Sequence, residues 1–249
     1  MSVVGILHPG EMGAALGTAL RSVRHEVLWA SEGRSEATRA RAADLEDAGT
    51  IAELAGRCEV LLSVLPPHAA LELAESLPHF RGIFVDANAV SPETAARVGA
   101  AAERFVDGGI VGAPSSPRVF LSGAEAARVA ALFEGSPIET EIVASASALK
   151  CAYAAWTKGT AALLLAIRDF ARAEDVEEAL VAEWARSQPH LLGRLSAAEG
   201  SAAGKGWRWV GEMQEIAAAF AADALPPGFH EAAADVFRAS SHGPPATKS

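Results

Sequence analysis

The sequence predicts an α/β domain with a doubly wound parallel sheet, followed by an all-helical domain. Up to residue 144, short apolar runs alternate with longer stretches of helical periodicity. Strands that alternate with helices are typical of a parallel sheet covered by helices on both faces. From residue 145 onward the strand signals stop and only helical patterns follow. We therefore expect an α/β domain over 1–144, a helical domain over 145–238, and a disordered tail over 239–249, which has no apolar periodicity.

The expected strands are short apolar runs, rich in β-branched residues and closed by Gly, Pro, Ser or Asp. They cover Val3–Leu7, Glu26–Ala30, Glu59–Leu65, Gly82–Ala87, Arg104–Ile110, Arg118–Gly123 and Ile138–Val143. In the C-terminal part, helical patterns cover residues 145–173, 174–187, 204–224 and 228–240.

Composition and charge exclude several classes of function. The chain has 249 residues and a formal net charge of −10, without a basic run, so nucleic acid is not an expected partner. Cys58 and Cys151 form neither a disulfide framework nor a metal-ligand spacing, so no metal is expected. The N-terminus does not resemble a signal peptide, and the longest apolar run, Gly159–Ile167, is too short to span a bilayer. We expect a soluble cytoplasmic protein without a membrane partner.

A glycine-bearing loop, "VGILHPGEMGAALG" from Val4 to Gly17, follows the first expected strand. Gly10 and Gly13 match the second and third glycines of the dinucleotide fingerprint G-x-G-x-x-G, but His8 stands at the first position. The run His8-Pro9-Gly10-Glu11 favours a type II turn, after which a helix opens and offers N–H groups to a phosphate. The expected cofactor contacts in this loop are His8, Pro9, Gly10, Glu11, Met12 and Gly13. The alternative is a glycine-bearing turn in an α/β protein that binds an unrelated ligand.

The residues after the second strand indicate which cofactor the loop would take. Ser31, Arg34 and Ser35 surround a single acidic residue, Glu32. A guanidinium with hydroxyls suits a 2′-phosphate, so NADP is preferred, while Glu32 keeps NAD open. The alternative is a solvated helix start with Ser35 as its N-cap.

Four further motifs occur in order along the chain: "EVLLSVLPPHAA", "DANAVSPET", "DGGIVGAP" and "SASALKCAYAAWTKG". Together with the loop they resemble the β-hydroxyacid dehydrogenase family, which is related to 6-phosphogluconate dehydrogenase, over about Val3 to Arg238. The resemblance implies a Rossmann-like domain, a long inter-domain helix with a catalytic lysine at Lys150, a helical substrate domain, and a homodimer. It places Val64, Leu65, Pro66 and Asn88 at the cofactor and Gly112 in the substrate loop.

The chain departs from the family pattern at positions that usually hold the substrate. The family serine of the substrate loop is Val111 here, its last glycine is Ala113, and the asparagine one turn after the lysine is Ala154. The sequence thus resembles a divergent branch. We hypothesise that Tyr153 or Thr157, which share a helix face with Lys150, orient the substrate oxygen in place of the asparagine.

The residues and the resemblance together favour an NADP-preferring oxidoreductase that transfers hydride between nicotinamide and a small hydroxy acid or related carbonyl compound. Lys150 would donate or accept the proton, since its neighbours are apolar and burial lowers the pKa of an ammonium. Lys158 is a second candidate for binding the substrate. On residue type alone, a lysine on a long helix is solvated or snorkelling. The alternatives are an imine reductase on the same fold and a dinucleotide-binding sensor without turnover.

Overall fold

The computed structural model describes residues 1–240, which form two compact units. The first unit is residues 1–150 and the second begins at Cys151. The expected boundary at residue 145 falls just before helix α7 (Ala146–Ala173), which starts in the first unit and continues in the second. Residues 239 and 240, expected to be disordered, are the last of helix α10; the rest of the expected tail lies outside the described residues.

The first unit is built on one eight-stranded sheet in the order β3-β2-β1-β4-β5-β6-β7-β8. The strands are β1 (Val3–Ile6), β2 (Glu26–Trp29), β3 (Glu46–Asp47), β4 (Val60–Ser63), β5 (Ile83–Asp86), β6 (Phe105–Val111), β7 (Arg118–Ser122) and β8 (Glu139–Ile142). This order contains the 3-2-1-4-5-6 arrangement of the doubly wound dinucleotide fold, so the predicted fold class is confirmed.

Two details of the sheet differ from the sequence prediction. The short strand β3 was not expected, because its polar pair Glu46-Asp47 gives no apolar signal. The sheet is also not entirely parallel, since β6 and β7 pair antiparallel through the hairpin between Val111 and Arg118.

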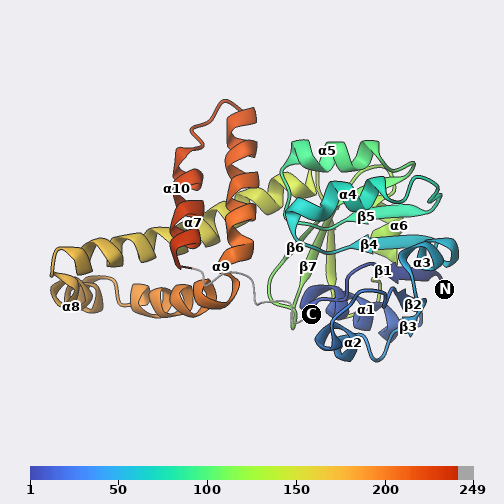
Figure 1. Cartoon of the computed structure of the whole chain (residues 1–249), viewed down its shortest axis with the longest axis horizontal. Helices are drawn as coiled ribbons and strands as arrows, with labels where there is room; N and C mark the ends of the chain where they lie inside the picture. Colours follow the sequence, from blue (N-terminus) through green and yellow to red (C-terminus); the bar gives the residue numbers. More distant parts are fainter. Residues whose placement is uncertain (241–249) are drawn as a thin grey trace. The chain divides into compact units, whose positions relative to one another are not determined.

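Helices cover both faces of the sheet, as Figure 1 shows. They are α1 (Glu11–Ser22), α2 (Glu36–Arg41), α3 (Ile51–Arg57), the 3-10 turn η1 (Pro67–Ala69), α4 (Ala70–Glu75), α5 (Pro92–Ala100) and α6 (Ala126–Ala131). Alternate residues of each strand point to opposite faces, so two apolar clusters form. Helices α1 and α6 pack on one cluster, and α3, α4 and α5 pack on the other. Because β1, β4, β5 and β6 run parallel, the loops at their carboxyl ends lie at the same edge of the sheet.

The second unit is helical, formed by the rest of α7 with α8 (Glu177–Ser187), α9 (His190–Ala222) and α10 (Gly228–Ser240). Its core joins α7, α9 and α10 around Met213 and Phe237. Helix α9 begins 14 residues before the expected start at residue 204, and Figure 1 shows that it is bent. Gly200, Gly204 and Gly206 lie in its middle, where glycine weakens a helix and permits a bend.

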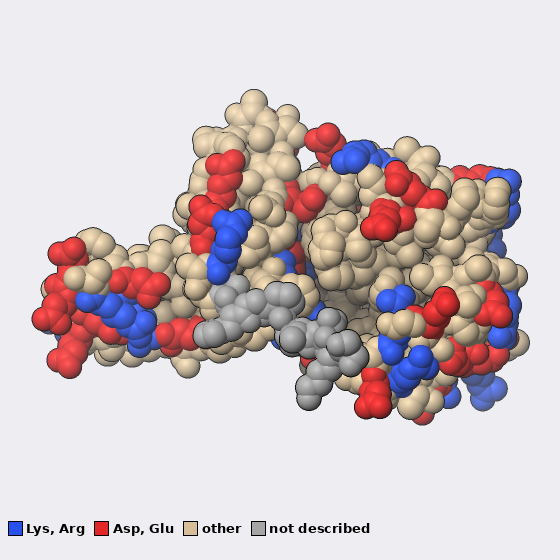
Figure 2. Space-filling view, in the orientation of Figure 1, with Lys and Arg blue, Asp and Glu red and all other residues tan. Residues whose placement is uncertain are grey.

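Within residues 1–240, no helix is long and apolar enough to cross a membrane. On the face drawn in Figure 2, Lys and Arg side chains lie among Asp and Glu side chains. The expectation that nucleic acid is not a partner stays a prediction.

Candidate cofactor and catalytic site

The loop after β1 turns in a different way from the type II turn that the sequence predicted. Gly10 has φ −64° and ψ −170°, whereas a type II turn needs a positive φ at this position. Instead, the Gly10 N–H donates to the His8 carbonyl oxygen at 2.9 Å, the i to i+2 bond of a γ-turn centred on Pro9. The reason is that α1 begins at Glu11, so Gly10 must serve as its extended N-cap residue.

Gly10 and Gly13 have different roles in this loop. A Cβ on Gly13 would lie 2.4 Å from the His8 carbonyl oxygen, so only glycine lets α1 pack this closely on the turn. A Cβ on Gly10 would meet nothing within 4 Å. The backbone at Gly10 is therefore open to a ligand at the first turn of α1, where backbone N–H groups and the helix dipole favour an anion. Glu11 is exposed and Met12 packs on the core beneath.

Two side chains beside the loop carry buried polar atoms that the protein does not satisfy. His8 Nδ1 and Arg34 Nε have no hydrogen-bond partner within the described residues. Arg34 reaches back to the end of β1, with its Nη2 3.4 Å from the Leu7 carbonyl oxygen. Burial, and then the charge of Arg34, lowers the pKa of His8 from 6.5 to about 4, so the imidazole is neutral at pH 7. Buried polar atoms are nearly always paired in native proteins, so this pair fits a site for a phosphate-bearing ligand.

At the carboxyl end of β2, charges of both signs meet. Asp47, on β3, holds the Ser31 hydroxyl, and this hydrogen bond is the main cause that lowers the pKa of Asp47. Arg39 donates to the Ser31 carbonyl oxygen at 2.7 Å. Ser35 caps α2 by accepting from the Thr38 N–H at 3.3 Å, as the alternative interpretation of this segment expected. Asp47 was missed from the sequence because only the pairing of β3 with β2 brings it to this edge.

Asn88 fixes the loop that follows β4. Its Oδ1 accepts from the Leu65 N–H at 2.6 Å, and its Nδ2 donates to Ser63 Oγ at 3.0 Å and to Asp86 Oδ1. The Asn88 side chain is 2% exposed, so its amide is committed to the protein. Asn88 thus holds the segment Val64 to Pro66 in place at the carboxyl ends of β4 and β5. This segment is the expected nicotinamide-side loop.

Asp107 of β6 anchors the start of α7. Its Oδ2 accepts from the N–H groups of Ala146 and Ser147, and from the hydroxyls of Ser122 and Ser147, at 2.9–3.0 Å. A carboxylate at a helix N-terminus satisfies N–H groups that lack a partner within the helix and is favoured by the helix dipole. Asp107 therefore determines where the first turn of α7 lies on β6.

Lys150 lies one turn further along α7. Its Nζ donates to the Ile110 carbonyl oxygen at 2.5 Å, and the residue is half-buried. Gly109 makes this approach possible, because a Cβ there would lie 2.7 Å from the Ala146 carbonyl oxygen and 3.2 Å from Lys150 Cβ. The amine is thereby brought to the same edge of the sheet as the loops after β1, β4 and β5.

The segment that matches the family's substrate loop lies at the end of β6, where the chain turns back to β7. Val111 is 8% exposed and packs with Phe120 and Ala146, so nothing polar replaces the family serine there. Gly112 has φ +101° and sits where a Cβ would be 2.7 Å from the Ser116 carbonyl oxygen. Glycine is thus required at residue 112 by the β6–β7 turn itself.

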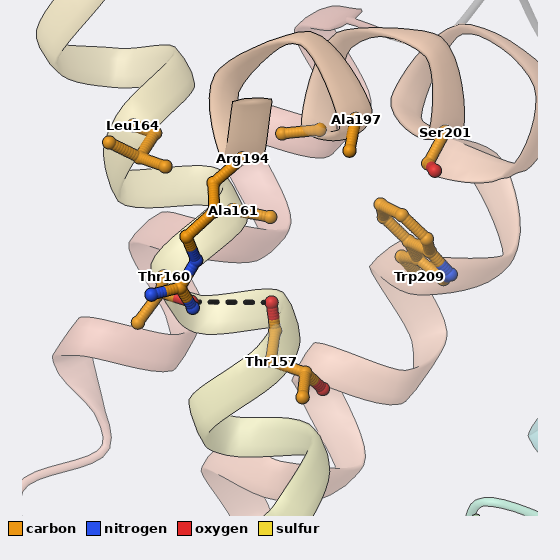
Figure 3. Close-up of a pocket in the computed structure, with 9 residues that line it drawn as sticks. Thr157, Thr160, Ala161, Leu164, Arg194, Ala197, Ser201 and Trp209 are labelled. Carbon is orange, nitrogen blue, oxygen red and sulfur yellow. Dashed lines mark hydrogen bonds between the residues drawn. The ribbon is translucent and has the colours of Figure 1, made fainter. Parts of the chain in front are cut away.

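The second unit contains a cavity of about 220 Å³ between α7 and α9, drawn in Figure 3. Its wall combines apolar residues with a guanidinium and hydroxyls: Thr157, Thr160, Ala161, Leu164, Arg194, Ala197, Ala198, Ser201 and Trp209. Thr157 donates to the Tyr153 carbonyl oxygen at 3.1 Å, which leaves its oxygen as an acceptor. Arg194 donates to Thr160 Oγ1 at 3.3 Å and lies over the Trp156 ring. Sequence reasoning missed Arg194, since nothing in its neighbourhood singles it out.

The two remaining candidates on α7 differ in environment. Tyr153 is 46% exposed, whereas Ala154, at the position of the family asparagine, is buried in the helical core. Lys158 forms an ion pair with Glu212 of α9 and lies 5.9 Å from the Trp209 ring centre. Its charge is thus already compensated, and a substrate carboxylate would have to compete with Glu212.

Comparison with known proteins supports the architecture. Residues 171–240 match a family model described as a domain of unknown function (DUF1932), and no curated protein matches the sequence. The chain is similar to the structure of the conserved protein MTH1747 of unknown function, reported to resemble 3-hydroxyacid dehydrogenases. The identity is 28% and the TM-score 0.70, over 96% of this chain and 97% of that one.

Two enzymes share the fold at lower identity. One is the 3-hydroxyisobutyrate dehydrogenase of Mycobacterium tuberculosis, with 16% identity and a TM-score of 0.69 over 96% of this chain and 93% of that one. The other is a reductive aminase of Aspergillus terreus solved with NADPH and ethyl levulinate, with 19% identity and a TM-score of 0.57 over 96% and 93%. The chain therefore has a Rossmann-like domain followed by a helical domain. More narrowly, its fold is that of the 3-hydroxyacid dehydrogenases, which confirms the resemblance inferred from the motifs.

Proposed function

We propose that the chain is an NADP-preferring oxidoreductase that acts on a small hydroxy acid or a related carbonyl compound. The observation that carries this proposal is the loop at the carboxyl end of β1. There the open backbone of Gly10 lies beside two buried polar atoms without partners, His8 Nδ1 and Arg34 Nε. In doubly wound sheets, ligands bind at this edge, where the strand order reverses between β1 and β4. The solved reductive aminase with this fold holds NADPH, which agrees with the same assignment.

In this proposal the first turn of α1, with His8 and Arg34, binds the cofactor phosphates, and the backbone of Val64 to Pro66 faces the nicotinamide. When bound, the cofactor supplies or accepts a hydride. Lys150 gives a proton to the carbonyl oxygen in the reducing direction and takes it from the hydroxyl in the oxidising direction. The Ile110 carbonyl oxygen orients the amine.

The choice of a hydroxy acid rests on the resemblance of the motifs to the family and on the fold shared with a 3-hydroxyisobutyrate dehydrogenase. Imine reduction is the second candidate, favoured by the apolar environments of Val111 and Ala154. The family has a serine and an asparagine at these positions, and their loss suits a substrate without the usual carboxylate. A carboxylate requirement in the substrate separates the two.

A homodimer is part of the proposal. Trp156, Leu163 and Phe170 lie seven residues apart on α7 and are 62%, 45% and 65% exposed in the single chain. A stripe with this spacing runs along one side of a helix and suits helix–helix contact. We expect sedimentation velocity to give a dimer and Leu163→Glu to give a monomer, while Arg186→Glu on the exposed side of α8 stays dimeric.

The deciding experiment titrates the purified protein with NADPH and NADH in parallel, followed by fluorescence. Tight binding of NADPH with weaker binding of NADH supports the proposal, and a screen of hydroxy acids, carbonyl compounds and imines then identifies the reaction. If neither nucleotide binds, the enzyme proposal is wrong. Binding without turnover on any panel member favours the sensor alternative.

A further inference from the structure

Two aspartates on neighbouring strands leave one buried oxygen each without a hydrogen-bond partner. Asp86 of β5 and Asp107 of β6 are register partners in the parallel ladder. Neighbouring strands lie roughly 4.8 Å apart, and paired residues point to the same face of the sheet. Asp86 Oδ2 and Asp107 Oδ1 are both buried, and neither has a donor among the described residues.

The other oxygen of each carboxyl is fully used. Asp86 Oδ1 accepts from Asn88 Nδ2, and the Ser63 hydroxyl also bonds to Asp86. Asp107 Oδ2 accepts the four donors at the start of α7 and on β7 described above. Each carboxyl thus has one oxygen that accepts hydrogen bonds and one buried oxygen without a donor among the described residues.

We propose that Asp86 and Asp107 share one proton between Asp86 Oδ2 and Asp107 Oδ1. An O–H from one carboxyl to the other satisfies both unpartnered oxygens with a single hydrogen. Without it, two carboxylates would face each other in a buried place, where their repulsion is weakly screened. The structure supports this assignment further, because burial and then the charge of Asp107 raise the pKa of Asp86 to about 7.

The charged groups around the pair favour placing the proton on Asp86. The elements packed against Asp86 present Ser63 from β4, Asn88 from the loop after β5, and Asp107 from β6, of which only Asp107 is ionisable. Asp107 instead accepts two N–H groups at the N-terminus of α7, which favour its charged form. We therefore place the shared proton on Asp86.

The shared proton makes the pair a positioning element. On one side it connects through Asn88 to the Leu65 N–H. On the other side it connects through Asp107 to the first turn of α7, one turn before Lys150. Loss of the proton would set two negative charges against each other and push the two sides apart. This consequence for catalysis rests on the proposed function, whereas the shared proton itself does not.

An infrared titration of the whole protein tests the shared proton directly. A protonated carboxyl has a C=O stretch that a carboxylate lacks, so we expect one such band at pH 6 that disappears as the pH rises through about 7. The band should be absent from Asp86→Asn and unchanged in Asp44→Asn, a matched control at an exposed aspartate. A wild-type protein without the band at pH 6, or a band that survives in Asp86→Asn, overturns the proposal. If Asp86→Asn does not fold, the wild-type titration decides alone.

The positioning role is tested by variants that differ only in the hydrogen they offer. Asparagine at residue 86 can donate to Asp107 permanently, whereas leucine cannot. We expect Asp86→Leu to lower kcat at least tenfold, with a smaller change in KM. Asp86→Asn should recover most of this loss. In the wild type, kcat should decline as the pH rises through about 7 and the shared proton is lost, and Asp86→Asn should remove this decline. Equal kcat values in the two variants overturn the positioning role. If no substrate is turned over, the proposed function fails, while the infrared band still decides the shared proton.

Discussion

The Lys150 ammonium donates to the Ile110 main-chain carbonyl oxygen at 2.5 Å, joining the first turns of α7 to the end of β6. This main-chain acceptor holds the end of the long side chain at β6. In the proposed function Lys150 transfers the proton, whereas Lys158, the other candidate lysine on α7, is paired with Glu212. The same edge of the sheet carries the loops of Gly10 and Leu65, so a hydride donor and a proton donor can act together there.

Lys150→Met should abolish most turnover while leaving cofactor affinity intact. Methionine keeps the length of the side chain but cannot carry a proton, and general acid–base groups contribute about 10²–10⁴-fold to rate. Steady-state kinetics measures the loss, and NADPH titration by fluorescence measures the affinity. The control is Lys205→Met on α9, which should retain its rate. A Lys150→Met protein with wild-type turnover would falsify the catalytic role.

Gly109→Ala should destabilise the first unit, because the new methyl group would lie 2.7 Å from the Ala146 carbonyl oxygen. Backbone cannot move aside as a flexible side chain does, so α7 must shift. We expect a loss of about 1–3 kcal/mol in the free energy of unfolding, measured by urea denaturation. Gly56→Ala is the matched control, since a methyl group there meets nothing within 4 Å and alanine favours helix α3. Equal stability of the two variants contradicts the close packing.

The balance of charges after β2 should set the preference between NADP and NAD. Removing the guanidinium in Arg34→Ala is expected to weaken NADPH binding about 10- to 100-fold more than NADH binding, since a charge-assisted hydrogen bond is worth about 1.5–3 kcal/mol. Asp47→Asn removes the carboxylate that holds Ser31 and should strengthen NADPH binding a few-fold. Parallel titrations with NADPH and NADH measure the ratio of the two affinities for each variant, with Glu32→Gln as a third variant. An Arg34→Ala change equal for both nucleotides refutes the 2′-phosphate assignment.

His8 should make the protein less stable in acid. Its folded pKa of about 4 lies below the ordinary 6.5, so the unfolded chain binds the proton more readily. The stability contributed by neutral His8 is therefore complete above pH 6.5 and is lost as the pH falls towards 4, by about 3 kcal/mol at most. Urea denaturation of His8→Asn at pH 7 and pH 4.5 should show a smaller pH dependence than the wild type. His79→Asn, at an exposed position, should keep the wild-type slope.

Local patterns predicted the alternation of strands and helices and the glycines of the cofactor loop, because each depends on a few consecutive residues. The type II turn was wrong because the preference of Pro-Gly for that turn competes with the start of α1 at Glu11, which requires an extended Gly10. The contacts Asp47–Ser31 and Asp86–Asp107 join residues through strand pairing. Register between strands is set by the whole sheet, so no local pattern could have revealed these pairs.

Arg194 should determine whether the cavity between α7 and α9 binds a carboxylate. Its guanidinium lies beside Thr160, and Leu164 and Trp209 belong to the wall of the same cavity, drawn in Figure 3. We expect Arg194→Ala to weaken the binding of a small carboxylic acid about 10- to 100-fold, the value of one charge-assisted hydrogen bond, as measured by calorimetric titration. The binding of the corresponding methyl ester should weaken far less. Arg194→Lys should recover only part of the affinity, because an ammonium lacks the planar fork that binds a carboxylate with two hydrogen bonds. The control is Arg208→Ala, an exposed arginine on the same helix that lies over Trp207. If the acid and the ester respond alike, Arg194 does not recognise a carboxylate.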